Sequence, residues 1–266
     1  MPARSVTALR LTAVATVIAF AGCAAAPTTE SAPAGAPPSA SARAVSTPSA
    51  TPSTSPAPSV GVTGSATSSP SPSATTRPKD TRTAAQRSKA FTVNGIPVVS
   101  KKHPINAAYR RSSVTSPHGL TRETQAALTR MIAAARAKGV RIIVRSGYRS
   151  YTEQAQILAR KIKEYGSESL ARRYNAAPGR SEHQTGLAAD LWDGVTWGLG
   201  VRNTKTGKWL WANAWRYGFI LRYPNGKEKI TGYAFEPWHY RYIGTKAAKA
   251  FGPNSNLTLE EYLGLA

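Results

Sequence analysis

"SEHQTGLAAD", residues 181–190, places His183 seven residues before Asp190. A histidine nitrogen and an aspartate oxygen are both zinc donors. Side chains seven residues apart on a straight strand point to opposite faces, so these two can meet one metal ion only if the chain turns between them. Gly186 is predicted to make that turn, and the apolar "LAADL" is predicted to be a buried strand that carries Asp190 inward.

A catalytic zinc needs a third protein ligand and an open position for water. His103 and His118 stand beside prolines in polar stretches, so both are expected at the surface. His239 lies in the aromatic stretch "FEPWHYRY", three residues after Glu236, and a glutamate beside a metal-bound water can act as general base. These residues form a candidate hydrolytic site. The structural alternative puts His239 in the core of an aromatic sheet and makes His183 a loop cap.

Apolar periodicity and turn residues predict a single compact α+β domain, with a small antiparallel sheet flanked by helices. Two capping boxes, Ser150 with Glu153 and Thr258 with Glu261, mark the starts of two helices. Aromatic and polar residues alternate on both sides of "PNGK" (224–227), which predicts two paired strands joined by a turn. In chain order we expect a hairpin at 91–100, a helix from Thr121 to Gly139, a strand at 140–147, helices at 151–165 and 167–174, a strand at 187–191, a helix before Gly218, strands at 219–224 and 229–244, and a C-terminal helix.

The N-terminus has the features of an exported protein. Arg4 and Arg10 precede an apolar run at 11–22, which is shorter than the ~20 residues of a membrane-spanning helix and matches the hydrophobic part of a secretory signal. The run ends in "FAGC", which looks like a bacterial lipobox. We therefore expect residues 1–22 to be a lipoprotein signal peptide and Cys23, the only cysteine, to be lipidated. The alternative is cleavage by a different signal peptidase and secretion without a lipid.

Residues 23–90 are dominated by Ala, Pro, Ser and Thr, so they are predicted to be a disordered linker. The foldable domain is then 91–266, which carries 27 Lys and Arg against 11 Asp and Glu in a chain of net charge +22. Such a field attracts polyanions. Because the usual nucleic-acid-binding motifs are absent and the N-terminus indicates export, we expect an anionic cell envelope as partner and no nucleic acid.

The same residues carry a resemblance to a known family. "SEHQTGLAAD" fits the pattern SxHxxGxAxD and "EPWH" fits ExxH. Together with "SGYRSYTEQ" and "YGFILRYPNGKEKITGY" they resemble the VanY-type D-alanyl-D-alanine carboxypeptidases of peptidase family M15, over roughly residues 95–250. The resemblance implies one zinc ion per chain, bound by His183, Asp190 and His239, with Glu236 as catalytic base.

The resemblance also implies which residues meet the substrate. Arg149 in "SGYRSYTEQ" is expected to bind the terminal carboxylate of the substrate or to stabilise the oxyanion. Gln154 and Ser181 match positions that line the substrate pocket, and Tyr233 and Trp238 are expected to wall the cleft. The alternatives are that Gln154 is a solvated helix residue and that Ser181 only caps a turn.

The activity implied by the resemblance is zinc-dependent removal of the C-terminal D-alanine from peptidoglycan stem peptides. Together with the lipid expected on Cys23, this predicts an enzyme anchored to the outer face of the cytoplasmic membrane. Relatives with this fold act as L,D-carboxypeptidases, dipeptidases or cross-link endopeptidases, so these activities stay open. A penicillin-binding serine mechanism is excluded because no serine has a lysine three residues later. An inert wall-binding module would need a lost ligand or base, and all four positions are intact.

Overall fold

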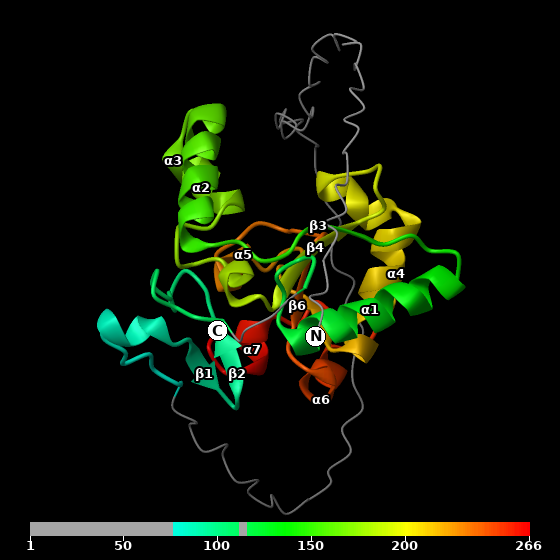
Figure 1. Cartoon of the computed structure of the whole chain (residues 1–266), viewed down its shortest axis with the longest axis horizontal. Helices are drawn as coiled ribbons and strands as arrows, with labels where there is room; N and C mark the ends of the chain where they lie inside the picture. The colour runs from blue at the N-terminus through cyan, green and yellow to red at the C-terminus, as the bar shows by residue number, and fades with distance from the viewer. Residues whose placement is uncertain (1–76, 112–115) are drawn as a thin grey trace, which may run out of the picture. The chain divides into compact units, whose positions relative to one another are not determined.

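A four-stranded antiparallel sheet organises the described part of the chain, in the order β3–β4–β6–β5 (Figure 1). Its strands are β3 (Ile143–Ser146), β4 (Ala188–Trp192), β5 (Phe219–Leu221) and β6 (His239–Tyr242). The computed structural model describes residues 77–111 and 116–266. The predicted signal peptide, Cys23 and most of the predicted linker lie outside these residues. Within the described ranges, no helix is long and apolar enough to cross a membrane.

The register of the two central strands sets the position of the candidate site. Asp190 on β4 lies directly opposite His239 on β6, and Ser146 on β3 lies opposite Asp190 from the other side. Directly opposite residues on antiparallel strands have Cβ atoms about 4.5–5.5 Å apart. Strand pairing alone therefore brings two of the predicted metal ligands together.

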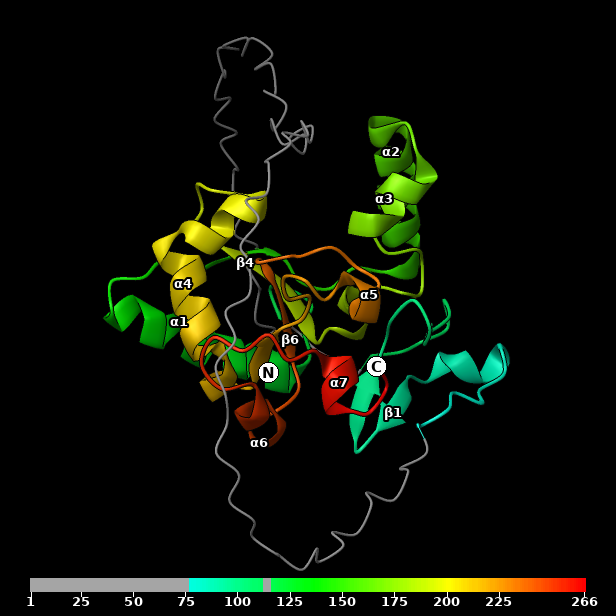
Figure 2. The same ribbon diagram turned by 180° about the vertical axis from the view of Figure 1, so that it is seen from behind.

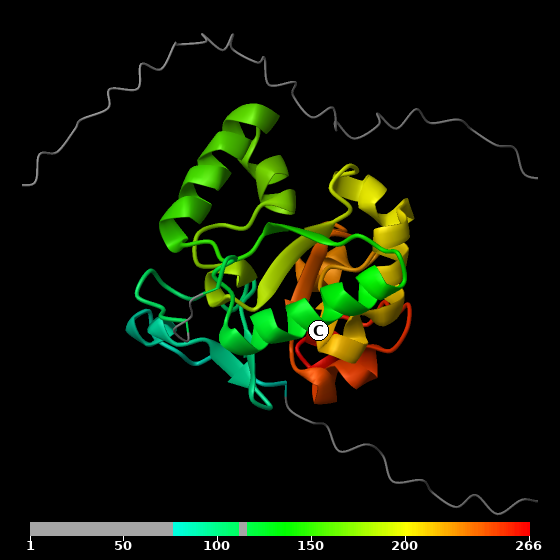
Figure 3. The ribbon, with the colours of Figure 1, turned by 45° about the vertical axis from the view of Figure 1, so that its right-hand side comes forward.

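Helices complete the α+β arrangement that the sequence predicts. Helices α1 (Arg122–Ala137) and α4 (Lys205–Asn213) lie against the sheet (Figure 3). Their apolar side chains pack on one face of it, where Leu128, Met131, Leu191 and Leu210 are fully buried in the main core. Burial of side chains of this size contributes about 1.5–3 kcal/mol each. The helices are α1 (Arg122–Ala137), α2 (Tyr151–Tyr165), α3 (Glu168–Tyr174), α4 (Lys205–Asn213), α5 (Glu228–Thr231), α6 (Thr245–Ala248) and α7 (Leu259–Tyr262).

Both predicted capping boxes are confirmed. The Ser150 side chain accepts a hydrogen bond from the backbone N–H of Glu153, whose carboxylate accepts one from the Ser150 N–H, and α2 ends at Gly166 in the left-handed region. Thr258 and Glu261 form the same pair at the start of α7. These local contacts satisfy N–H groups that a helix N-terminus leaves free. Because the contacts involve residues only three apart, the sequence predicts the first residues of these two helices correctly.

A second, smaller core lies around the hairpin of β1 (Phe91–Val93) and β2 (Ile96–Val98) (Figure 2). Asn94 and Gly95 connect the two strands with φ values of 51° and 77°, as a type I′ turn requires, so the predicted hairpin is confirmed. Its apolar side chains pack with residues of β5 and of the C-terminal helix α7. The N-terminal hairpin and the C-terminus therefore support the same end of the sheet.

The segment between β5 and β6 differs from the prediction. The strand expected at 229–244 is confined to His239–Tyr242, and "PNGK" leads from β5 toward helix α5 rather than into a hairpin. Helix α5 ends at Gly232, which has a φ of 81°. The aromatic residues that follow pack with other aromatic side chains near the site, as Tyr233 does on Tyr223. Tertiary packing here overrides the alternating pattern that suggested a strand.

The ordered chain begins earlier than residue 91. Arg82 forms an ion pair with Asp80 at 2.6 Å, and its guanidinium donates to the carbonyl of Pro104 at 3.0 Å. Residues 85–88 form a short 3-10 helix. Composition assigned residues 77–90 to the linker because they contain few apolar side chains, and their anchoring depends on polar contacts that composition does not reveal.

His103 is not a surface histidine, so that prediction is wrong. Its ring is 8% exposed and stacks on Phe91 with the centroids 4.6 Å apart. Its Nδ1 lies 3.0 Å from Oγ of Ser100, and burial lowers the pKa of the imidazole. His118 is half-buried. Neither histidine belongs to the cluster formed by His183, Asp190 and His239.

Candidate metal centre

His183, Asp190 and His239 form one buried cluster. Each offers a ligand atom, and these atoms all lie within 4.8 Å of one another. Oδ1 of Asp190 is 3.3 Å from Nε2 of His183 and 3.2 Å from Nδ1 of His239. The two imidazole rings meet edge to face, with an interplanar angle of 89°. Two nitrogens and one carboxylate oxygen thus converge on one point.

The local backbone explains how His183 reaches this point. It lies in the 3-10 helix η2 (Glu182–Thr185), which ends at Gly186 with a φ of 69°. A left-handed conformation is costly for residues with a Cβ, so glycine suits the turn that leads into β4. A Cβ at Gly186 would also lie 3.2 Å from the carbonyl oxygen of Gly119. The predicted turn at Gly186 is confirmed.

A backbone carbonyl fixes the tautomer of His183. Nδ1 of this ring lies 2.6 Å from the carbonyl oxygen of Gly147. Because a carbonyl only accepts, Nδ1 must carry the proton, and Nε2 then presents its lone pair toward Asp190. This is the arrangement by which proteins orient a metal-ligating histidine.

The cluster fits a zinc ion. Oδ1 of Asp190 is buried and has no hydrogen-bond partner among the described residues, although two imidazole nitrogens face it. Buried polar atoms without a partner are uncommon in native proteins. Catalytic zinc takes three nitrogen or oxygen ligands from the protein and keeps a fourth position open. The His183, Asp190 and His239 donor set matches that requirement.

The charges around the cluster favour a cation. Burial by itself would raise the pKa of Asp190, but His183 and His239 hold it well below its usual range. Burial would likewise lower the pKa of His239, but the facing carboxylates of Asp190 and Glu182 outweigh this effect and raise it to about 9. The surrounding carboxylates therefore stabilise positive charge at this point.

Glu236 lies at the rim of the cluster. Its Oε2 is 3.7 Å from Nδ1 of His239, and its backbone N–H donates to the carbonyl of Tyr223. Burial raises the pKa of Glu236 to about 8, with Asp190 adding to the shift and His239 opposing it. A buried carboxylate of raised pKa next to a metal cluster is suited to proton transfer near neutral pH.

Arg149 lies on the other side of Asp190. Its Nη2 is 3.7 Å from Oδ2 of Asp190 and donates to Oγ of Ser146 at 3.1 Å, while Nη1 donates to Oε1 of Gln154 at 2.7 Å. The Arg149 side chain remains 19% exposed, against 9% for Asp190. The guanidinium is therefore held in place and still open to a ligand.

Gln154 is buried behind Arg149, so it is not a solvated helix residue. Its side chain is 1% exposed, and its Nε2 donates to the carbonyl of Ala176 at 2.6 Å while its Oε1 accepts from Arg149. Both ends of the amide are thus engaged within the protein. The structure gives Gln154 the position of a residue that orients Arg149, while direct contact with substrate stays a prediction.

The other predicted substrate residues lie around the cluster. Ser181 is buried and directly precedes η2. Tyr233 donates from its hydroxyl to the carbonyl of Arg180 at 3.2 Å, and its ring packs on Tyr223, which in turn lies 4.9 Å from His239. Trp238 is partly exposed, and its ring lies 5.2 Å from that of Trp197. Their contacts with substrate stay predictions.

Glu182 is a site residue that the sequence analysis missed. It is fully buried, and its Oε2 lies 3.4 Å from Nε2 of His239. Its other oxygen accepts hydrogen bonds from Arg222 and Arg241. The sequence did contain a hint of such a residue. Arg222 and Arg241 lie in segments predicted to be buried strands, and a buried arginine needs a carboxylate partner.

A scan against family models matches residues 117–245 to VanY, described as D-alanyl-D-alanine carboxypeptidase. The D-alanyl-D-alanine carboxypeptidase of Enterococcus faecalis (strain ATCC 700802 / V583) is 38% identical over 176 residues, which cover 62% of this chain and 64% of that enzyme. Across four curated relatives, the matched segments span between 36% and 67% of the relative's own length.

Solved structures match over most of their length. The LdcB LD-carboxypeptidase is 35% identical with a TM-score of 0.57, and the match covers 67% of this chain and 94% of that one. A zinc complex of the vancomycin-resistance D,D-pentapeptidase VanY, from a VanB-type cassette, is 39% identical with a TM-score of 0.56, covering 62% of this chain and 97% of that one. This chain therefore belongs to the VanY family of D-alanyl-D-alanine carboxypeptidases.

Proposed function

We propose that this chain is a zinc carboxypeptidase that removes the C-terminal D-alanine from peptidoglycan stem peptides. The observation that carries the proposal is the convergence of His183, Asp190 and His239 on one point that Glu236 and Arg149 flank. The family relation supports it, since relatives are named D-alanyl-D-alanine carboxypeptidase and one is solved with Zn(II).

The clustered residues and Glu236 have different roles in hydrolysis. A zinc ion held by Nε2 of His183, Asp190 and Nδ1 of His239 would supply Lewis acidity toward water and the scissile carbonyl. The Glu236 carboxylate takes one proton from the attacking water and returns it to the amine of the departing D-alanine. One water is consumed, and the products are the shortened peptide and free D-alanine.

Arg149 supplies the positive charge that a carboxypeptidase needs. Its guanidinium can hold the terminal carboxylate in a bidentate pair or stabilise the developing oxyanion. Gln154 and Ser146 hold the side chain so that Nη2 faces Asp190. A fixed cation at this distance from the cluster favours cleavage near a free C-terminus over cleavage within a chain.

L,D-carboxypeptidase activity is the second candidate, because LdcB matches the chain about as well as VanY does. The two activities differ in the residue that precedes the scissile bond. Cross-link endopeptidase activity would act on a bond that is not followed by a free terminal residue. These specificities are separable with defined substrates.

The test uses the zinc-loaded protein and synthetic stem tetrapeptide and pentapeptide, each with a free or an amidated C-terminus. We expect mass spectrometry to show loss of one D-alanine from the free pentapeptide only, and no cleavage after treatment with chelator. Cleavage of the free tetrapeptide alone would replace the proposal with L,D-carboxypeptidase activity. Cleavage of the amidated pentapeptide would indicate endopeptidase activity, and no cleavage at all would indicate an inert wall-binding module.

We also propose that the protein is exported and anchored to the outer face of the cytoplasmic membrane by a lipid on Cys23. The support is the signal-like run at 11–22 and the "FAGC" motif, together with the basic domain, which suits an anionic envelope. A Cys23→Ser variant should leave the membrane fraction and appear in the medium. Unchanged membrane association in that variant would argue against lipidation at this position.

A further inference from the structure

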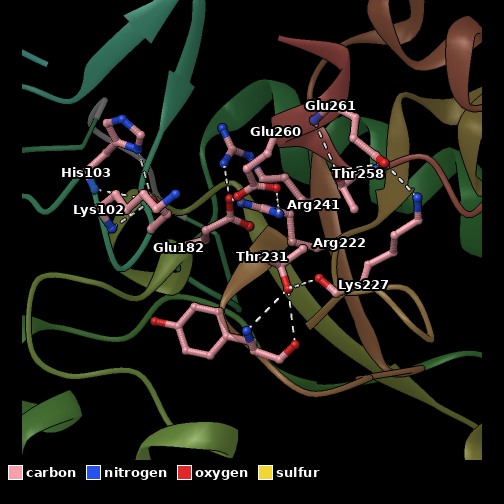
Figure 4. A network of polar contacts seen from close by, with 12 residues as sticks. Lys102, His103, Glu182, Arg222, Lys227, Thr231, Arg241, Thr258, Glu260 and Glu261 are labelled. Carbon is pink, nitrogen blue, oxygen red and sulfur yellow. Dashed lines mark hydrogen bonds and ion pairs between the residues drawn. The ribbon is translucent and has the colours of Figure 1, made fainter. Parts of the chain in front are cut away.

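Glu182 lies in a buried charge network with Arg222, Arg241 and Glu260 (Figure 4) and also faces His239 of the metal cluster. Its Oε1 accepts hydrogen bonds from Nε of Arg222 at 2.8 Å and from Nη1 of Arg241 at 2.6 Å. Its Oε2 faces Nε2 of His239 at 3.4 Å. One oxygen of the carboxylate is therefore held by two guanidinium groups, which fixes the direction of the other.

The network is charge-balanced and spans distant parts of the chain. Arg222 donates two hydrogen bonds to Glu260 of α7, at 2.8 and 2.6 Å. Arg241 donates to the backbone carbonyl of Pro97 on β2. Two arginines and two glutamates, all at least 94% buried, thus form a neutral set that joins the site to the hairpin and the C-terminal helix.

His239 has two ring nitrogens with different surroundings. Nδ1 faces Asp190 at 3.2 Å and Glu236 at 3.7 Å, and is the nitrogen available to a metal ion. Nε2 faces Glu182. An ionised carboxylate only accepts hydrogen bonds, so Glu182 can hold a proton on Nε2, and Nδ1 would then offer its lone pair when a metal ion occupies the cluster.

We infer that Glu182 is a positioning residue that fixes the tautomer and the orientation of His239 for metal binding. Glu182 does for His239 what the carbonyl of Gly147 does for His183. The inference rests on the proposed function insofar as the cluster binds zinc, but it does not depend on which peptide bond is cleaved. Outer partners of this kind typically contribute 10–100-fold to metal affinity or activity.

The test replaces Glu182 by Gln and measures zinc affinity by competition with a chelator, without substrate. The two arginines keep the amide oxygen on their side, so the Gln N–H group faces His239 and favours the tautomer with its proton on Nδ1. We expect Glu182→Gln to weaken zinc binding about 10–100-fold. The visible spectrum of the cobalt-loaded protein, which reports ligand geometry, should change as well.

Glu260→Gln is the matched control. It removes one negative charge from the second carboxylate that pairs with Arg222. Unlike Glu182, Glu260 forms no hydrogen bond or ion pair with His239 among the described residues. We expect this variant to keep the zinc affinity and the cobalt spectrum of the parent protein. Equal losses in the two variants would show that charge balance, rather than orientation of His239, carries the effect, and would overturn the inference.

A charge-balanced double variant separates weaker zinc binding from loss of the fold. Glu182→Gln leaves one buried arginine uncompensated, which can destabilise the fold strongly. Glu182→Gln combined with Arg241→Gln restores neutrality and should unfold cooperatively, yet still bind zinc 10–100-fold more weakly. If this folded double variant binds zinc as tightly as the parent, the inference is wrong. If the parent binds zinc tightly but cleaves no stem peptide, only the proposed function fails.

Discussion

Replacement of Glu236 by Gln is expected to lower kcat for release of D-alanine about 10²–10⁴-fold, the usual contribution of a general base. The change preserves the shape of the side chain but removes the group that takes the proton from water. Zinc should stay bound, because Glu236 is not one of the three clustered donors and its Oε2 lies 3.7 Å from Nδ1 of His239. Turnover of the free pentapeptide and zinc content by elemental analysis measure the two effects.

Glu228→Gln provides the control for that variant. Glu228 lies eight residues earlier, at the start of α5, and pairs with Arg173 at the surface. The same change of charge there should leave kcat intact, because a surface ion pair typically contributes 1 kcal/mol or less. Loss of zinc from the Glu236→Gln protein would identify Glu236 as a ligand and would remove it from the role of base.

The sequence correctly predicts those parts of the fold that depend on residues close together in the sequence. The capping boxes at Ser150 and Thr258 and the Asn94–Gly95 turn are signals within four residues, and all appear in the structure. The strand predicted at 229–244 is present only at His239–Tyr242, where it pairs with β5 as expected, because the aromatic residues before it pack elsewhere. Tyr233 packs on Tyr223 near His239 instead of alternating across a sheet.

The same distinction holds for the site. The donors at His183 and Asp190 can be predicted because the Gly186 turn lies between them in the sequence. The contact of Glu182 with His239 could not be predicted, because the two lie 57 residues apart in the sequence and the pairing of β4 with β6 brings them together. Gln154 was ambiguous for a similar reason, since its burial depends on contacts with Arg149 and with the loop after α3.

Replacement of Asp190 by Asn is expected to weaken zinc binding more than about 100-fold, since loss of an outer partner alone can reach that size. The amide keeps the shape of the carboxylate but not its charge, and Asp190 is the only carboxylate in the clustered donor set. A ligand present at 1,000 times its Kd stabilises a protein by about 4.1 kcal/mol, and a 100-fold weaker site at the same zinc concentration yields about 1.4 kcal/mol. Thermal unfolding with and without zinc measures this difference.

Asp193→Asn is the matched control, three residues along the same chain segment. Asp193 accepts hydrogen bonds from the N–H groups of Val195 and Thr196, which an asparagine oxygen can also accept. This variant should keep both the full stabilisation by zinc and the release of D-alanine. An equal zinc-dependent stabilisation in the Asp190→Asn protein would mean that the ion binds elsewhere. The convergence of His183, Asp190 and His239 would then be a structural hydrogen-bonding cluster, and hydrolysis by this chain would need a different explanation.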